Sequence, residues 1–189
     1  MYCSRQFRDA TRKYMCRFDE ILDTMAAGMI CAQINGSISH NFIVQMIPHH
    51  RGAIEMSRNI LKYTAFLPLR EMAQNIITKQ TESIKNMREI LSGCEDKTNS
   101  PQDICMYQKN FRTITCTMLS QMKNACADNQ ISANFIREMI PHHMGAIHMS
   151  KNALSFHICP QLIPVLQAII SSQEKGIEEM RGLLKCLCE

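Results

Sequence analysis

The sequence carries a segment in which two adjacent histidines follow a proline and methionines stand on either side. It reads MIPHHRGAIEMS from Met46 to Ser57, and it returns as MIPHHMGAIHMS from Met139 to Ser150. Neutral imidazole is a ligand for copper, zinc, iron and nickel, and thioether sulfur favours soft ions such as Cu(I) and, by the same softness, Ag(I). The duplicated segment therefore predicts either soft-metal sites or a repeated piece of apolar core.

Helical spacing would bring the donors of this segment to one side of a helix. Met46 lies one turn before His49 and His50, and Met56 lies two turns after His49. Pro48 cannot donate a backbone hydrogen bond, so we expect a kink just before the histidines. The opposite, outward face is predicted to carry Gln45, Arg51, Glu55, Arg58 and Lys62.

A further donor would have to come from a neighbouring helix. Met87 is the natural candidate because it lies on the apolar stripe of a predicted helix between Pro68 and Gly93. Gln80 lies on the same stripe, needs a partner, and could fix an imidazole by a hydrogen bond. Each of these methionines could equally be a core side chain. That simpler interpretation is preferred for Met25, Met29, Met118 and Met122.

The repeat extends over nearly the whole chain. Between residues 39–61 and 132–154, 16 of 23 positions are identical, and weaker matches continue on both sides. Each half has the periodicity of three helices, so we predict an all-α fold. Its four-helix-bundle core would be made from two pseudo-symmetric three-helix repeats, residues 1–94 and 95–189, within one compact domain.

Turn and capping signals set the predicted helix ends. The first helix should end near Asn35-Gly36, and Ser39 and Ser132 are predicted N-caps of the histidine-bearing helices. Pro101 suits the first turn of the helix that opens the second half. The last helix should begin near Pro160 or Pro164.

Composition narrows the class of protein. The formal charge is +4, and the charged residues are scattered along the chain, which argues against a nucleic-acid surface. No apolar run is long enough to span a membrane. The amino-terminal residues lack an apolar signal region, so the cytoplasm is the default expectation, with export if a signal was trimmed. The ten cysteines are predicted to be mostly free thiols.

The motif F-x-x-x-M-I-P-H-H-x-G-A-I-x-M, at 42–56 and 135–149, is followed by Q-x-x-x-I-x-x-M at 80–87 and 173–180. This combination resembles two tandem copies of domain-of-unknown-function family 305. The resemblance implies a ferritin-like helical fold, which the family has. It also implies binding of copper or silver, since some exported bacterial members of the family bind these metals. It implies metal ligands at Met46, His49, His50, Met56, Met87, Met139, His142, His143, Met149 and Met180.

The chain departs from the family pattern at two kinds of position. Ser39 and Ser132 stand where members often have an acidic residue, and Ser83 and Gly176 stand where a glutamate is common. These losses argue against hard metals and leave the soft histidine–methionine set.

The expected function is therefore binding of Cu(I) or Ag(I) for storage, buffering or tolerance, with zinc as a further possible metal and no enzymatic activity. A metal ion is the expected partner, with neither nucleic acid nor membrane, and a homo-oligomer is left open. Two alternatives remain: a ferritin-like di-metal oxidase, which would need carboxylate ligands, and a helical interaction module without metal.

Overall fold

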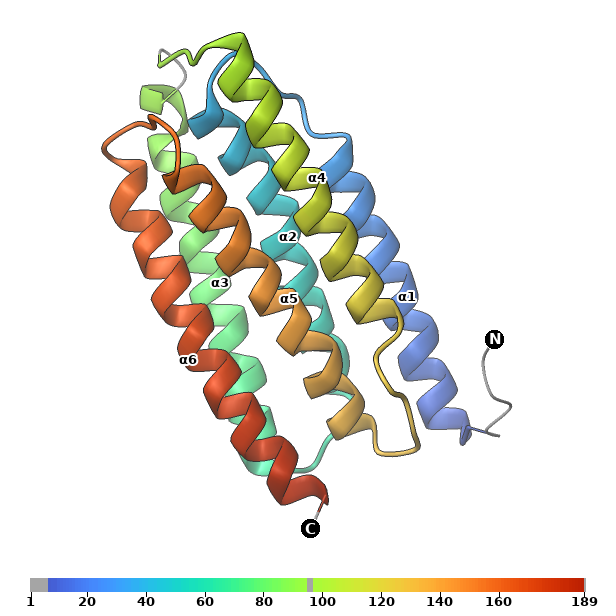
Figure 1. Ribbon diagram of the computed structural model, residues 1–189. Helices are drawn as coiled ribbons and strands as arrows, with labels where there is room; N and C mark the ends of the chain where they lie inside the picture. Colours follow the sequence, from blue (N-terminus) through green and yellow to red (C-terminus); the bar gives the residue numbers. More distant parts are fainter. Residues whose placement is uncertain (1–6, 95–96, 189) are drawn as a thin grey trace.

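The computed structural model describes residues 7–94 and 97–188, and all of its regular structure is helical. The described residues contain no strand, so the predicted all-α class is confirmed. Six helices follow one another along these described residues (Figure 1): α1 (Asp9–Ile30), α2 (Ile38–Ile60), α3 (Leu67–Cys94), α4 (Pro101–Lys123), α5 (Ile131–Leu154) and α6 (Leu162–Cys188).

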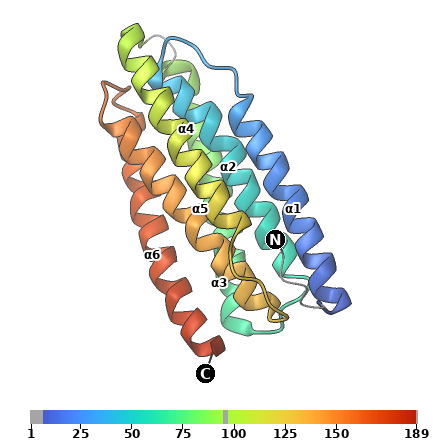
Figure 2. The ribbon, with the colours of Figure 1, turned by 45° about the vertical axis from the view of Figure 1, so that its right-hand side comes forward.

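The helices form three layers of two. The central layer consists of α2 and α5, which pack against each other; α1 and α4 cover one side of it, and α3 and α6 cover the other. A second view keeps the same neighbours (Figure 2). The expected four-helix bundle of α2, α3, α5 and α6 is present, with the first helix of each half alongside it. The central helices are therefore covered on two sides.

Apolar stripes build the core between these layers. On α1 the buried stripe contains Tyr14, Phe18, Ile21, Met25 and Met29, spaced by three and four residues. The matching residues of α4 are Tyr107, Phe111, Met118 and Met122. Complete burial of such a side chain contributes about 1.5–3 kcal/mol, so these stripes hold the outer helices onto the central pair.

Several predicted helix ends were wrong by a few residues. Helix α1 ends at Ile30, before the expected Asn35-Gly36 signal. The N-cap of α2 is Ser37, whose Oγ accepts from the His40 amide at 3.3 Å. Ser39 lies inside the first turn, and its Oγ accepts from the Cys159 amide at 2.8 Å.

In the second half, α5 begins at Ile131, so Ser132 is not its N-cap either. The prediction for Pro101 is confirmed, because it occupies the first turn of α4 behind the N-cap Ser100.

The two repeats make matching contacts between layers. Asn59 Nδ2 donates to the Tyr14 carbonyl at 3.1 Å, and Asn152 Nδ2 donates to the Tyr107 carbonyl at 3.2 Å. The Tyr107 hydroxyl donates to Gln45 Oε1 at 3.1 Å. Gln45 is buried, so its predicted outward orientation was wrong: α4 covers the face of the central layer from which this side chain projects.

A disulfide bond joins Cys94, at the end of α3, to Cys159, in the loop before α6, with Cα atoms 5.4 Å apart. The prediction of free thiols was wrong for this pair. Six other described cysteines are free and exposed: Cys16, Cys31, Cys105, Cys116, Cys126 and Cys186. Cys3 and the Cys188 side chain lie outside what is described. Across the described chain, no helix combines the length and apolar character needed to cross a membrane.

Candidate metal centre

Four buried histidines lie at the middle of the central layer, where α2 and α5 meet. His49 and His50 come from α2, and His142 and His143 come from α5. Helix α2 continues through Pro48, so consecutive side chains project about 100° apart around its axis. One histidine of each pair therefore points across the α2–α5 interface and the other points toward the α3–α6 layer.

The inner pair, His49 and His142, joins the two repeats. Their rings stack with centroids 3.8 Å apart. Nε2 of His142 donates to the His49 main-chain carbonyl at 3.2 Å. A neutral imidazole carries one proton, so this bond places the proton on Nε2 and leaves the lone pair on Nδ1.

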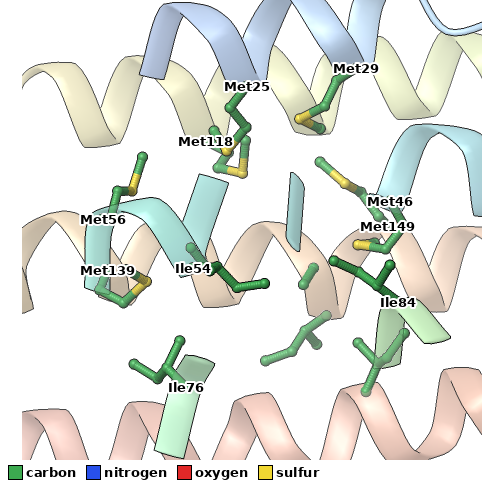
Figure 3. Packing of buried hydrophobic residues seen from close by; sticks show 14 of the residues in the cluster. Met25, Met29, Met46, Ile54, Met56, Ile76, Ile84, Met118, Met139 and Met149 are labelled. Carbon is green, nitrogen blue, oxygen red and sulfur yellow. The ribbon is translucent and has the colours of Figure 1, made fainter. Parts of the chain in front are cut away.

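One thioether from an outer helix reaches this inner pair. Nε2 of His49 lies 3.3 Å from Sδ of Met118. Met118 fills the space beside Gly145, where a Cβ would lie 2.8 Å from its Cγ, and Met25 fills the matching space beside Gly52. Figure 3 shows both methionine side chains projecting from α1 and α4 toward the central helices.

Met25 and Met118 were predicted to be ordinary core residues, so the sequence reasoning missed the contact of Met118 with His49. The glycine two or three positions after the histidines was the available signal. Because glycine has no side chain, a side chain from another helix can pack at this position, next to the two histidines.

The outer pair, His50 and His143, faces the α3–α6 layer. Nε2 of His50 is hydrogen-bonded to Ser83 Oγ at 3.0 Å. In the second repeat the matching position is Gly176, whose absent Cβ would lie 3.1 Å from Nε2 of His143. The predicted hydrogen bond from Gln80 to an imidazole is not formed, because Ser83 takes that place on α3 and Gln80 Oε1 has no partner.

The methionines implied by the motif are all buried, but they are spread along the bundle. Ten residues of helix separate Met46 from Met56, which is about 15 Å, so one ion cannot bind both. In Figure 3, Met46 and Met149 lie in one part of the core, and Met56 and Met139 lie in another. On the third helices, Met87 and Met180 are fully buried, and Met180 lines a cavity together with His143.

Burial keeps the four imidazoles neutral. It is the largest cause in every case, and it lowers the pKa of His50 to about 3 and that of His142 to about 4. For His49 and His143, neighbouring histidines lower the pKa further. The Nδ1 atoms of all four are buried without a hydrogen-bond partner. An unpaired buried nitrogen costs about 1–3 kcal/mol, and a bound ion would satisfy it, so the donor set fits a metal.

Hard ligands do not gather at this centre. The described residues contain no group of three or more His, Cys, Asp or Glu side chains placed to hold a metal. A third protein ligand would therefore be a group of another kind, and thioether sulfur lies beside His49. The buried carboxyl nearest in sequence, Glu138, accepts a hydrogen bond from the Tyr14 hydroxyl at 2.5 Å, and burial raises its pKa to about 8.

The fold and the centre together define an all-α bundle whose core holds duplicated histidine–methionine segments. The sequence profile described as "Domain of unknown function (DUF305)" matches residues 39–184, so the chain belongs to that family. No curated protein matches the chain.

Solved structures resemble most of the bundle. CopM in a silver-bound form obtained by soaking is 27% identical over 78% of this chain and 94% of its own, with a TM-score of 0.57. CopM in a Cu(II)-bound form is 26% identical over 79% and 97%, with a TM-score of 0.59. A DUF305 fragment from Deinococcus radiodurans, 22% identical over 82% and 97% with a TM-score of 0.57, shares the fold.

Proposed function

We propose that the chain binds Cu(I) or Ag(I) through imidazole nitrogen and thioether sulfur at the centre of the bundle, for storage, buffering or tolerance of the metal. The observation that carries this proposal is the set of four buried imidazoles whose Nδ1 atoms have no partner, with the Met118 sulfur 3.3 Å from Nε2 of His49. Neutral imidazole nitrogen and thioether sulfur are donors that suit a soft monovalent ion.

The inner histidines are the proposed centre of the site. His49 and His142 come from different repeats and are stacked, so an ion bound there would be shared by both halves. Met118, whose sulfur lies against His49, is added here to the ligands implied by the motif, and Met25 is its counterpart in the first repeat. Met46 and Met139 lie one turn before the inner histidines and are further candidates.

The structural neighbours support copper or silver as the metal. CopM, which shares the bundle at more than a quarter identity, has been crystallised with silver and with Cu(II). Zinc is the second choice, because structural zinc sites use thiolate and imidazole, and the free cysteines described lie exposed on the surface.

The alternative of a di-metal oxidase has less support. Such centres use several inward carboxylates on bundle helices. Glu138 is the one acidic residue buried in the described part of the chain, and it is bonded to Tyr14. Absence of oxidase activity is likewise part of the proposal.

Titration of reduced protein with Cu(I) against a competing chelator tests the proposal. The variant with His49, His50, His142 and His143 all changed to Ala should lose bound metal, whereas a control with His148 and His157 changed to Ala should keep it, because both are exposed. Circular dichroism of the metal-free variants checks that the helices persist. Unchanged stoichiometry in a folded quadruple variant would refute the proposal.

A further inference from the structure

A groove lies between α3 and α6, on the side of the central layer opposite α1 and α4. It has a volume of about 530 Å³, and its lining includes His50, His143, Gln80, Gln173 and Met180. These five side chains are buried, whereas charged groups at the rim are exposed. The groove therefore connects solvent with the outer histidines of the metal centre.

The floor of the groove is polar and unsatisfied. Oε1 of Gln80 and Oε1 of Gln173 have no hydrogen-bond partner, and the same holds for Nδ1 of His50 and of His143. Buried polar atoms are rarely left without a partner in folded proteins. The residues that carry these atoms line the groove from both repeats, so the wall of the groove is polar as well as apolar.

The two repeats differ at the position that faces the outer histidine. Ser83 places its hydroxyl 3.0 Å from Nε2 of His50. Gly176 has no side chain, and the point that a Cβ would occupy lies 3.1 Å from Nε2 of His143. The second repeat therefore has no hydroxyl at the position from which Ser83 bonds to the outer histidine of the first repeat.

His143 consequently differs from the other three histidines. His49 has sulfur beside Nε2, His142 donates to a carbonyl, and His50 is bonded to Ser83. Within the described chain, Nε2 of His143 has no hydrogen-bond partner and borders the groove beside Gly176, whereas Nδ1 is fully buried near the Met139 backbone. A nitrogen lone pair that is reachable and unoccupied is the first donor that an incoming ion meets.

We propose that this groove is the route by which a soft metal ion reaches and leaves the centre, and that the ion first binds Nε2 of His143, beside Met180, in the second repeat only. The inference rests on the proposed function, and it makes the two halves of the duplicated motif unequal. The step is a ligand substitution in which the metal keeps its oxidation state. The Nε2 lone pair replaces one ligand of the incoming ion, and that ligand leaves. The groove is much larger than one ion, so it admits an ion that still holds a small carrier ligand.

Chemical labelling of the metal-free protein tests the accessibility on which the inference depends. Diethyl pyrocarbonate acylates unprotonated, accessible imidazole nitrogen, and peptide mass spectrometry reports each histidine separately. Exposed His148 is the internal reference. We expect His143 to react about fivefold faster than His50, the factor that one hydrogen bond supplies. Equal rates at His50 and His143 would overturn the inference, whether or not the protein binds metal.

Exchanging the residues of the two repeats gives a second, matched test. Gly176→Ser should slow both the labelling of His143 and the transfer of Cu(I) to a chromogenic chelator, by about fivefold. Ser83→Gly should open His50 and speed its labelling. Gly182→Ser is the control, because it lies on the same helix and a Cβ there meets no atom within 4 Å.

Each outcome of these exchanges has a distinct meaning. Cu(I) transfer that is unchanged in folded Gly176→Ser would overturn the route. If that variant does not fold, the labelling of wild-type protein and of Ser83→Gly still decides between the two histidines. Fast labelling of His143 in a protein that takes up no Cu(I) would overturn the proposed function, and with it the use of the groove for metal.

Discussion

The imidazole rings of His49 and His142 stack across the α2–α5 interface, 3.8 Å between centroids, although 93 residues separate them in the sequence. The contact joins the two copies of the duplicated motif at their most polar position. An apolar pair would pack there without unsatisfied nitrogen, so the histidines at this interface lower the stability of the metal-free protein. That stability cost separates a metal centre from a packing device, and experiments can measure it.

Replacing His142 with Phe keeps a flat ring at the interface and removes both nitrogens. We expect the metal-free variant to be as stable as the wild type, or more stable by about 1 kcal/mol, because a buried nitrogen without a partner is lost. Its Cu(I) affinity should fall by more than roughly tenfold, which is the loss produced by changing a residue that only hydrogen-bonds to a metal ligand. Urea unfolding and chelator competition measure the two quantities. A strongly destabilised variant with unchanged affinity would favour the packing role.

Silver binding should raise the melting temperature. A ligand that binds only the folded state contributes about 2.7 kcal/mol at one hundred times its Kd, which corresponds to about 5–10 °C for a chain of this size. Differential scanning fluorimetry with Ag(I), Zn(II) and Mg(II) compares the candidate metals. A shift with Zn(II) and none with Ag(I) would reverse the proposed choice, and no shift with any of them would favour an interaction module.

The fold could be predicted from the sequence because its signals are local and repeated. Apolar residues spaced by three and four define the stripes of α1 and α3, and the 93-residue offset doubles each observation. The helix ends were less predictable, since caps depend on contacts with distant segments. Ser39 was expected to cap α2, but its hydroxyl binds the Cys159 amide, which no local pattern reveals.

The candidate site was predictable only as far as the motif extends. The histidines were located correctly on the inner side of their helices. Gln45 was misplaced because the pattern analysis assumed one solvent face for α2, whereas this helix lies in a central layer covered on both sides. Met25 and Met118 look like any core methionine in sequence, and only the three-dimensional packing brings them to Gly52 and Gly145.

Acid should destabilise the metal-free protein through its buried histidines. Their pKa values in the folded state lie below the ordinary value of 6.5, at about 3 for His50 and about 4 for His142. Between those values and pH 6.5 the unfolded chain binds more protons than the folded one, so stability falls as the pH decreases below about 6.5. Urea unfolding at pH 7 and pH 5 measures this loss. The quadruple Ala variant should show a smaller loss, and an equal one would show that other groups cause it.

Loss of the Cys94–Cys159 bond should destabilise the fold without affecting metal binding. The bond closes a loop of 65 residues, and such cross-links typically contribute about 2–4 kcal/mol by restricting the unfolded chain. We expect Cys159→Ser to lower the free energy of unfolding by that amount and Cys186→Ser, at an exposed free thiol, to change it little. Urea unfolding without reductant makes the comparison. Equal stability of both variants would mean that the bond does not form in solution.

Changing Glu138 to Gln should remove a second, opposite dependence on pH. Glu138 is the repeat counterpart of Gln45, it bonds to Tyr14 as Gln45 bonds to Tyr107, and burial raises its pKa from 4.5 to about 8. Between these two values the folded state binds more protons than the unfolded state, so the carboxyl makes the protein less stable as the pH rises from about 5 to 8. Glutamine keeps the acceptor for the Tyr14 hydroxyl but does not ionise.

The free energy of unfolding of the variant, measured in urea, should therefore match that of the wild type near pH 4 and exceed it at pH 8. A variant less stable than the wild type at pH 8 would show that the ionised carboxylate stabilises the fold, which would contradict the raised pKa.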